Sequence, residues 1–437
     1  MKVLSKYNYL YPIGDVTVLY NIISDNILLL RPQIVQLIES YKNNIGQLKE
    51  IHPEFFEKLE ENSMLLNTDK DEILELIDRW KKEEKESSSF FLTIYPTIDC
   101  NLRCWYCYES HENNACMDND TVLKVRKLIR NVICRKKIKN LFLSFFGGEP
   151  LLRFEEIVKP FISYTRDMCK DHNVDLYIDI TSNGVLMTDD VINDLLSLEL
   201  NNTPLFQITL DGNRKEHNKV KFTKNGRGTY DIIINNIKNA LKAGIPINNR
   251  LNYTQKNIDS LIDVLDEYSE LTKEERKNLF VDFQQVWQDA SNQSARNKAL
   301  KLASLYRIHS CQVRMDKRLN RGRCNNDMEN QATINYNGLV YKCTAIDFKS
   351  DNAEGKLKDD GTIEWNNRCS RRMEYRFGNS NCHSCKIFPI CHGGCSQVMM
   401  DGGNINSACL LGYSEDDKND IIKKRIEYIL ENRKAVY

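Results

Sequence analysis

The sequence has no long apolar run and no excess of charge of either sign. No stretch approaches the roughly 20 consecutive apolar residues of a membrane-spanning helix, and the amino-terminal sequence MKVLSKYNYLYPIGD lacks an apolar core followed by a cleavage site. Basic and acidic side chains each number 61, so overall electrostatic attraction to nucleic acid is not expected. These absences predict a cytoplasmic protein with no membrane and no nucleic-acid partner.

Cysteine, in contrast, is abundant. Fifteen cysteines are many for a reducing compartment, where clustered thiols bind metal or do chemistry more often than they form disulfides. Four isolated cysteines are interpreted as ordinary buried thiols: Cys116, Cys134, Cys169 and Cys369. The rest concentrate in two regions of the chain, and five of them fall between residues 382 and 409. Their clustering predicts metal sites.

The pattern of the chain changes twice. Residues 1–89 begin with two short predicted strands within residues 16–30, continue with helix-like stretches and end in the charged, serine-rich run KKEEKESSS, which indicates a linker. Residues 90–299 alternate apolar β-type runs with amphipathic helical stretches. Residues 300–437 are rich in cysteine and poor in periodicity until a last helix, which indicates a segment held by metal. Three domains with these bounds are expected.

The middle part contains six predicted βα units. The strands are expected at residues 90–97, 141–148, 175–184, 205–212, 247–254 and 279–286. Six units are two short of a complete barrel, so the sequence predicts an α/β fold with a partial (β/α)6 barrel of the TIM type, preceded by a small α+β domain. Because ligand-binding loops gather at the carboxyl ends of parallel strands, the residues that follow each strand are the candidate site.

Three cysteines follow the first predicted strand with C-x3-C-x2-C spacing: Cys100, Cys104 and Cys107. Zinc sites usually join one C-x2-C pair to a second pair, which this part of the sequence lacks. Iron–sulfur clusters use compact runs of thiolates, and three thiolates leave one iron with an open position. A fortuitous trio of thiols is the alternative, but the spacing favours a catalytic cluster.

This spacing, with Tyr106 just before the third cysteine, resembles the signature of the radical S-adenosylmethionine (SAM) enzymes. The resemblance implies that the three cysteines bind a 4Fe-4S cluster and that SAM occupies the fourth iron. Reductive cleavage of SAM would give methionine and a 5'-deoxyadenosyl radical, which abstracts hydrogen from the substrate. It also implies a partial (β/α)6 barrel, in agreement with the six units, and an external one-electron reductant such as flavodoxin or ferredoxin.

Three more strand ends resemble motifs of the same family. The second ends in FFGGEP, where Gly147 and Gly148 allow close backbone approach and Glu149 would receive the SAM ammonium. The third ends in TSNG, whose SAM-contacting residues would be Ser182 and Asn183, and the fourth ends in TLDG, which contains Asp211. A glycine turn after a strand is ordinary structure by itself, so the order of the three motifs makes them informative.

One position departs from the family pattern. The family often continues with an arginine that reaches the SAM carboxylate, but here the sequence DGNRKEHNKVK has Asn218 and Lys221 in place of the usual acid and arginine. Lysine cannot make a bidentate contact. Arg250, near the end of the fifth predicted strand, is a possible substitute.

The later cysteines closely resemble the SPASM extension of radical SAM enzymes, which holds two auxiliary 4Fe-4S clusters. The resemblance implies that Cys324, Cys343 and Cys395 ligate the nearer cluster, which either Cys311 completes or an open iron leaves free for substrate. The outer cluster would have four ligands: Cys382, Cys385, Cys391 and Cys409. A zinc knuckle is the alternative but would leave several cysteines idle. His383 and His392 are interpreted as neighbours of the ligands.

SPASM proteins chiefly modify peptides and proteins, so two substrates compete. A ribosomally made precursor peptide would gain a crosslink, thioether or epimerised centre, whereas a sulfatase would gain formylglycine. Sulfatase maturases carry a catalytic aspartate directly after the cysteine that matches Cys343, but here that residue is Thr344, and Asp347 is a weak candidate. Residues 1–89 resemble small domains that capture a leader peptide as an added strand. We therefore expect a peptide maturase, with a sulfatase maturase as the alternative; a simple electron carrier would not explain GGEP beside the three cysteines.

Overall fold

The computed structural model of the protein describes residues 2–68, 71–289, 293–309, 311–313, 324–402 and 409–434. The chain forms two compact units. The first consists of residues 1–86, 315–329 and 371–437, and the second of residues 87–314 and 330–370. The three functional domains expected from the sequence stay a prediction, because the boundaries of compact units need not coincide with those of functional domains.

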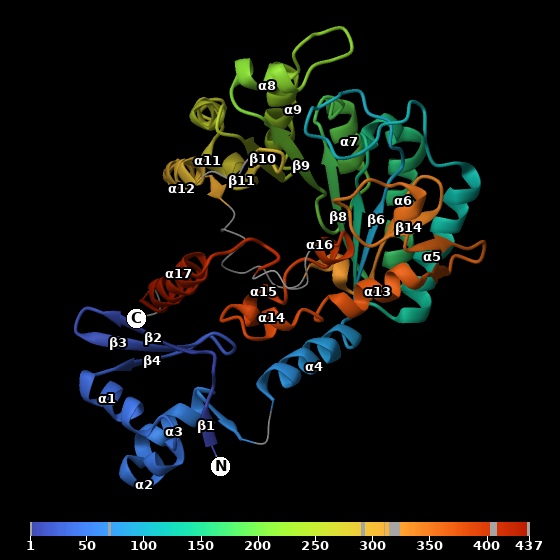
Figure 1. The fold of residues 1–437 in the computed structure, drawn as a ribbon. Coiled ribbons are helices and arrows are strands. Elements are labelled where there is room, and N and C mark those ends of the chain that lie inside the picture. The colour runs from blue at the N-terminus through green and yellow to red at the C-terminus, as the bar shows by residue number, and fades with distance from the viewer. Residues whose placement is uncertain are drawn as a thin grey trace. The chain divides into compact units, whose positions relative to one another are not determined.

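The second unit is built on the six predicted strands, which pair side by side in chain order and are all parallel (Figure 1). They are β6 (Ser89–Ile94), β7 (Asn140–Phe145), β8 (Asp175–Ser182), β9 (Leu205–Leu210), β10 (Ile247–Tyr253) and β11 (Leu279–Gln285). Different strands flank the two ends, β12 (Gln312–Val313) beside β11 and β13 (Gln331–Ile334) beside β6, so the described sheet is open. The predicted α/β fold with a partial barrel is confirmed.

Helices follow these strands as predicted. The longer ones are α5 (Asn119–Lys136), α6 (Lys159–Asp171), α7 (Asp189–Ser197), α9 (Tyr230–Lys242) and α12 (Gln293–Ile308), and three short ones are α8 (Arg214–Val220), α10 (Leu261–Asp266) and α11 (Lys273–Arg276). Helix α5 begins where the Asp118 side chain accepts a hydrogen bond from the Thr121 amide at 2.8 Å, as an N-cap should. Helix α12 runs past residue 299, the end of the barrel part expected from the sequence.

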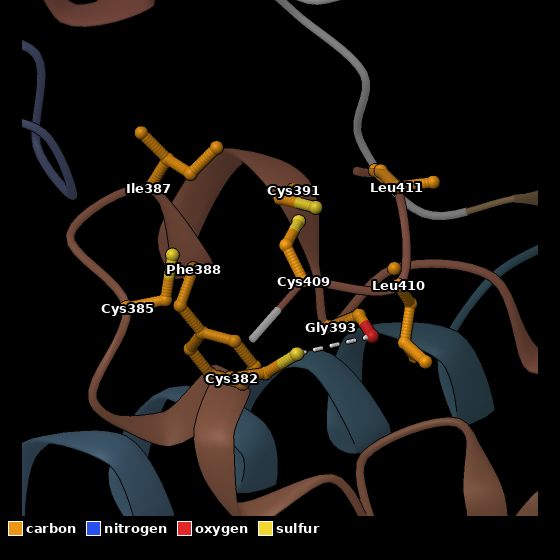
Figure 2. Close-up of a pocket in the computed structure, with 10 residues that line it drawn as sticks. Cys382, Cys385, Ile387, Phe388, Cys391, Gly393, Cys409, Leu410 and Leu411 are labelled. Carbon is orange, nitrogen blue, oxygen red and sulfur yellow. Dashed lines mark hydrogen bonds between the residues drawn. The ribbon is translucent and has the colours of Figure 1, made fainter. Parts of the chain in front are cut away.

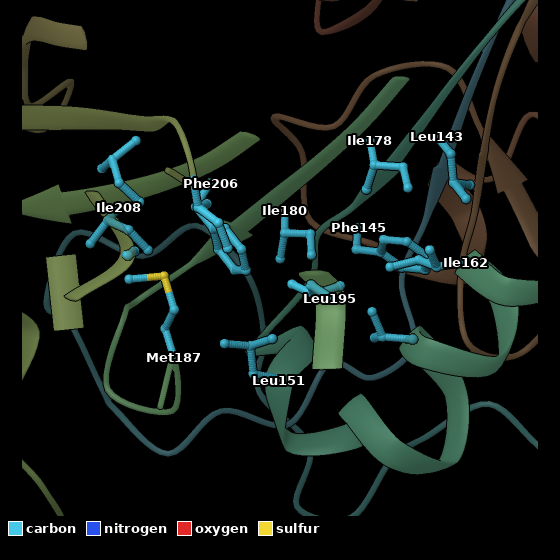
Figure 3. Close-up of a cluster of buried hydrophobic side chains, with 14 of the residues drawn as sticks. Leu143, Phe145, Leu151, Ile162, Ile178, Ile180, Met187, Leu195, Phe206 and Ile208 are labelled. Atoms are coloured by element: carbon cyan, nitrogen blue, oxygen red, sulfur yellow. The ribbon is translucent and has the colours of Figure 1, made fainter. Parts of the chain in front are cut away.

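The core of this unit lies on one face of the sheet. Alternate residues of β6, β7 and β9 are buried, as expected for strands with two unlike faces. The buried set packs against apolar helix residues such as Ile162 and Leu195 (Figure 3). The opposite face carries a row of stacked rings, with Phe142 between Phe91 and Tyr177 at centroid distances of 4.7 and 4.8 Å. Packed side chains on both faces of the sheet therefore hold the strand ends in place.

The apolar period of residues 155–170 predicts a helix after FFGGEP, but regular α-helix begins there only at Lys159. Residues Pro150–Arg153 form a 3-10 turn and Phe154–Val158 a π turn, and only then does α6 start. Pro160 has no amide hydrogen, so the regular α-helical bond from residue 160 to residue 156 cannot form. The wider π turn is a known way to accommodate such a defect.

An extension of the sheet was not predicted from the sequence. Beyond β13, which runs parallel to β6, three short strands continue the sheet in antiparallel fashion: β14 (Leu339–Tyr341), β15 (Gly355–Leu357) and β16 (Ile363–Trp365). Ala332 and Ile334 of β13, Val340 of β14 and Leu357 of β15 belong to the apolar core of the second unit. Cys343 thus follows a strand that belongs to the same sheet as the barrel.

The first unit combines both ends of the chain. Its amino-terminal part has β1 (Lys2–Leu4) paired with β5 (Leu65–Asn67), and an antiparallel sheet of β2 (Asn8–Ile13), β3 (Val16–Asn21) and β4 (Asn26–Leu30), so the strands predicted within residues 16–30 are confirmed. Its helices are α1 (Pro32–Tyr41), α2 (Leu48–Ile51), α3 (Pro53–Glu61) and α4 (Glu72–Lys85). The carboxyl-terminal part has α14 (Ser380–His383), α15 (Phe388–Cys391), α16 (Ser396–Met400) and α17 (Glu415–Lys434), and α13 (Asn367–Tyr375) crosses from one unit into the other.

One apolar cluster joins these two parts. Tyr7, Tyr20 and Trp80 from the amino-terminal part pack in it with Phe388 and Ile426 from the carboxyl-terminal part. Arg425 of α17 pairs with Asp25 at 2.6 Å, and Figure 1 shows α17 beside the β2–β3–β4 sheet. Among the described residues, no helix has the length and apolar character needed to cross a membrane.

Candidate active site at the ends of the barrel strands

The three-cysteine motif lies in the loop that follows β6. Cys100 is buried, Cys104 is half-buried and Cys107 is exposed. Asp99 holds the loop in shape, since its side chain accepts hydrogen bonds from the amides of Cys100 at 2.8 Å and of Asn114 at 3.0 Å. The thiols are therefore presented by an anchored loop at the carboxyl end of the first barrel strand.

The glycines of FFGGEP bring the end of β7 against this loop. A Cβ atom at Gly147 would clash with the carbonyl oxygen of Thr97, and one at Gly148 would clash with that of Asp99. Gly147 also has φ +117°, which side chains rarely adopt. The amide of Glu149 donates to the carbonyl of Asp99 at 2.9 Å. Close backbone approach, expected from the sequence, is thus observed.

Glu149 is fully buried, and residues from the neighbouring strand surround its carboxylate. Ser182 donates its hydroxyl to one oxygen at 2.8 Å, and the amide of Asn183 donates to the other at 2.8 Å. The amide of Leu151 adds a third bond at 3.0 Å. Asn183 also donates its side-chain amide to Asn101 in the cysteine loop at 2.7 Å. The structure therefore brings together the second strand end, the third strand end and the cysteine loop.

This carboxylate has no protein cation beside it: among the described residues, no ion pair involves Glu149. Burial raises the pKa of Glu149 to about 7, although its three hydrogen bonds oppose the rise. Burial and the nearby Glu149 carboxylate also raise the pKa of the Cys100 thiol to about 12. A buried acid and buried thiols are both stabilised in their charged forms by a positive ligand. This donor set fits an iron–sulfur cluster together with the ammonium of SAM.

A second buried group lies at the end of β9. Lys221 pairs with Asp211 at 2.7 Å and donates to the carbonyl of Thr209 at 3.0 Å, while Tyr106 donates its hydroxyl to the other Asp211 oxygen at 2.8 Å. Burial would lower the pKa of Lys221, but the Asp211 carboxylate outweighs it and raises the pKa above its usual value. The aromatic residue of the cysteine motif is thus tied to the TLDG strand end.

These bonds show how Lys221 differs from the arginine of the family pattern. Its ammonium is already occupied by Asp211 and Thr209. Arg250, the suggested substitute, is half-buried on β10 and donates to Asn252 at 2.9 Å, and no ion pair of Arg250 is found in the described part of the chain. A contact between Arg250 and the SAM carboxylate stays a prediction.

Glu109, which lies two residues after the three-cysteine motif, was not predicted from the sequence. It is 9% exposed, and neither carboxylate oxygen accepts a hydrogen bond of normal geometry. The hydroxyls of Tyr95 and Tyr108 near it are directed to the carbonyl of Thr344 at 3.3 and 2.9 Å. Burial raises the pKa of Glu109 to about 8, although Tyr95 opposes the rise. The sequence feature that could have identified Glu109 is the position of an acidic residue two residues after the third cysteine.

Asp347, the weak catalytic candidate, is engaged in the structure. It accepts a hydrogen bond from Ser110 at 2.9 Å and pairs with Lys349 at 2.9 Å. Burial would raise the pKa of Asp347, but the bonds from Lys349 and Ser110 outweigh it and lower the pKa. A paired acid of low pKa is a poor proton acceptor.

The four cysteines assigned to an outer cluster surround one small cavity in the first unit (Figure 2). Cys382, Cys385, Cys391 and Cys409 line it together with apolar residues such as Phe388. Burial, and then the neighbouring thiols, raise the pKa of Cys382 to about 12. Among the described residues, no group of three His, Cys, Asp or Glu side chains is placed to bind a single metal ion. A 4Fe-4S cluster does not require such a group, because each of its irons takes one thiolate.

The cysteines assigned to a nearer cluster fall in both units. Cys343 belongs to the second unit, whereas Cys324 and Cys395 belong to the first, so their joint role stays a prediction. Cys311 is packed among the apolar core residues of the second unit, and burial raises its pKa to about 11. That environment suits an ordinary buried thiol and lends no support to Cys311 as a ligand.

Comparisons with known proteins find similarity to one protein family and to several relatives. The family model of the radical SAM superfamily matches residues 94–268. The chain is 22% identical over 450 residues to the radical SAM cyclopropyl synthase TigE of Paramaledivibacter caminithermalis, an alignment that covers 91% of this chain and 86% of TigE. It is 28% identical over 144 residues to a cysteine-type anaerobic sulfatase-maturating enzyme of Clostridium novyi, which covers 32% of this chain and only 37% of that relative.

Two solved structures have a similar fold. Native anSMEcpe with bound AdoMet and the Cp18Cys peptide has a TM-score of 0.59 and 19% identity, and the match covers 79% of this chain and 99% of that one. Streptococcus suis SuiB bound to the precursor peptide SuiA has a TM-score of 0.51 and 16% identity, with 91% of this chain and 97% of that chain covered. At these identities the likeness concerns the fold alone.

Proposed function

We propose that this chain, an enzyme with a radical SAM domain at residues 94–268, modifies a ribosomally made precursor peptide. The observation that carries the proposal is the buried Glu149 carboxylate, which the third strand end holds beside Cys100 and which pairs with no cation among the described residues. When bound, the cluster and SAM supply a 5'-deoxyadenosyl radical that abstracts a hydrogen atom. The residues of the chain bind, orient and shield these groups.

Each residue of the site has an assigned task in this proposal. Cys100, Cys104 and Cys107 bind the cluster, and Glu149 accepts the SAM ammonium. Ser182 and Asn183 hold that carboxylate in place, so their hydrogen bonds set its orientation. The Lys221–Asp211–Tyr106 bonds fix the aromatic side chain that precedes Cys107. A preorganised site of this kind costs no reorganisation when SAM binds.

The proposal includes two auxiliary 4Fe-4S clusters in a SPASM extension. The cavity lined by Cys382, Cys385, Cys391 and Cys409 supports the outer one. The nearer one would use Cys324, Cys343 and Cys395. An external one-electron reductant such as flavodoxin or ferredoxin completes the proposed system.

The amino-terminal sheet supports a peptide substrate. Its edge strand β2 contains Pro12, which has no amide hydrogen, and its Tyr9 hydroxyl is bonded to the carbonyl of Lys386 at 2.7 Å. The other edge strand, β4, has one partner strand among the described residues and carries Leu29, which is 62% exposed. An extended leader peptide can add to such an edge through main-chain hydrogen bonds. We therefore assign leader capture to β4.

Sulfatase maturation is the second candidate, favoured by the 28% identity over 144 residues to the Clostridium novyi enzyme. The residue after Cys343 is Thr344, which cannot act as a carboxylate base, and Asp347 is bound to Lys349 and Ser110. These observations favour the peptide substrate. A chain that converts a sulfatase-derived cysteine or serine peptide to formylglycine would reverse the choice.

Anaerobic reconstitution tests the cofactors. We expect about twelve irons per chain from three 4Fe-4S clusters, and reductive formation of 5'-deoxyadenosine. Replacing Cys100, Cys104 and Cys107 with alanine should remove about four irons and all SAM cleavage. Cys134, which was expected to be a buried thiol, is exposed in the structure and is the matched control, since Cys134→Ala should change neither quantity. A chain that holds about four irons, or that never cleaves SAM, would contradict the proposal.

Peptide modification is tested by co-expression with a short peptide encoded beside the gene, followed by mass spectrometry. Leu29→Lys should weaken binding of that peptide about tenfold or more, because a lysine on an edge strand opposes strand addition. Leu10→Lys on the opposite edge is the control and should bind normally. Deleting the whole amino-terminal part is a poorer test, since it would uncover the apolar cluster shared with α17. Equal affinity of both variants would refute leader capture at β4.

A further inference from the structure

Helix α4 supplies an aromatic side chain to the cysteine-rich end of the chain. Trp80, 6% exposed, stacks on the ring of His392 with centroids 3.9 Å apart and an interplanar angle of 14°. It also contacts the rings of Phe388 at 5.5 Å and Phe377 at 5.8 Å. His392 directly follows Cys391, and Phe388 lines the cavity of the four cysteines.

The segment beneath Trp80 has an unusual backbone. His392, Gly393 and Gly394 have φ of 57°, 89° and 91°, so three successive residues are left-handed between Cys391 and Cys395. Glycine adopts this conformation without cost, but histidine pays for it, and the surrounding structure must hold it there. The carbonyl of Gly393 accepts a contact from the Cys382 thiol at 3.5 Å, so this segment forms part of the cavity wall.

Three further contacts tie the same region to the first 86 residues. The Tyr9 hydroxyl donates to the carbonyl of Lys386 at 2.7 Å, and Lys6 donates to the carbonyl of His383 at 3.2 Å. Arg376 pairs with Glu84 of α4 at 2.8 Å, with both side chains buried. The loop from residue 382 to residue 391 is therefore held by both the β2 strand and α4.

We propose that Trp80 is a positioning residue of the outer cysteine site: its stacking on His392 holds residues 392–394 left-handed and so directs Cys391 into the cavity. This inference rests on the proposed function, because it takes the outer cysteines as cluster ligands. It adds that the part of the chain assigned to leader capture also contributes to the outer cysteine site, whose residues lie about 300 positions later in the sequence. Loading of that site and order in the amino-terminal part are then coupled.

The test uses the full chain, reconstituted anaerobically with iron and sulfide. Trp80→Leu keeps an apolar side chain in the core but removes the stacked ring, whereas Trp80→Phe keeps a ring. The double variant Cys382→Ala/Cys385→Ala identifies the electron paramagnetic resonance signal of the outer cluster, because it lacks that signal. The Trp80→Leu variant should either lose about one third of the bound iron or show a change in that signal. Trp80→Phe should restore both. Leu74→Ala on the exposed side of α4 is the control and should match the wild type.

A second readout does not depend on the cluster signal. Removing iron from the wild type with a chelator should speed amide hydrogen exchange in β3 and α4, and Trp80→Leu should show fast exchange already when loaded with iron. Wild-type iron content, signal and exchange in Trp80→Leu would overturn the inference while leaving the proposed function intact. Absence of SAM cleavage in the wild type would instead refute the proposed function.

Discussion

Arg376 and Glu84 form a buried ion pair, with their nitrogen and oxygen 2.8 Å apart and side chains only 6% and 2% exposed. The same arginine nitrogen also donates to the carbonyl of Asp327 at 2.8 Å. The pair joins α4 to the segment that leads into the outer cysteines. Replacing the arginine removes a charge partner of the buried Glu84 carboxylate, which is costly.

Arg376→Ala should therefore lower the free energy of unfolding by about 3–5 kcal/mol, because the Glu84 carboxylate stays buried. The double variant Arg376→Met/Glu84→Leu should recover most of that loss, since it removes both charges. Thermal or denaturant unfolding of the three proteins measures the difference. A single variant as stable as the wild type would show that the pair contributes nothing.

Glu149→Gln tests the acid of the proposed SAM site. The amide keeps the size of the side chain but loses the charge that we expect to bind the SAM ammonium, so the affinity for SAM should fall about 10- to 100-fold, the worth of a charge-assisted hydrogen bond. The SAM-free variant should be less stable than the wild type by about 1–3 kcal/mol, because the amide nitrogen of glutamine cannot accept one of the hydrogen bonds that reach the two carboxylate oxygens. Calorimetric titration with SAM and thermal unfolding give both answers, and unchanged affinity would contradict the assignment.

Lys221→Arg introduces the residue of the family pattern and should nevertheless destabilise the protein. The wild-type side chain is buried in a space fitted to its bonds with Asp211 and Thr209, so the larger guanidinium should lower the free energy of unfolding by about 1–3 kcal/mol through overpacking. It should not tighten SAM binding. A tighter complex without loss of stability would show instead that arginine is the better SAM ligand here.

Gly148→Ala should disrupt the cysteine loop. The added methyl group would meet the backbone at Asp99, which cannot move without shifting Cys100, so cluster loading at the three-cysteine site should fall. Gly46→Ala is the matched control, because its new methyl group meets only the Asn44 side chain, at 3.7 Å. Iron analysis and SAM cleavage of the two variants decide the matter, and equal loading would argue against close approach at Gly148.

His217 predicts a defined pH dependence. Burial, and then the nearby Lys221 ammonium, lower the pKa of His217 to about 3, although Asp211 opposes the shift. Its ring otherwise meets Thr229 and Tyr230. The unfolded chain binds a proton below the ordinary value of about 6.5 and the folded chain does not, so stability falls as the pH drops from about 6.5 towards 3, by up to about 1.4 kcal/mol per pH unit.

His217→Gln cannot take up that proton, so its stability should fall less between pH 6.5 and pH 5. Unfolding of both proteins across this range measures the difference. Parallel curves for the wild type and the variant would show that His217 does not titrate as expected.

Local pattern was enough to predict the barrel strands and most of the site. Each of the six strands is a short run whose apolar residues define it, and the motifs around Cys100, Glu149, Ser182 and Asp211 each occupy the end of one strand. A parallel sheet brings such ends together, so their meeting followed from the order of the motifs. The start of the helix after FFGGEP was predicted too early, because Pro160 changes the backbone hydrogen bonds and leaves the apolar period unchanged.

Contacts between distant residues could not be predicted in the same way. The sequence by itself determined the spacing of the cysteines, the number of barrel strands and the motifs at their ends, because these are properties of short segments. Only the tertiary structure decided that no cation of the described residues pairs with Glu149, that Lys221 is already paired, and that Trp80 lies on His392. Burial and partner choice depend on which surfaces pack together, and neither residue spacing nor hydrophobic period encodes that choice.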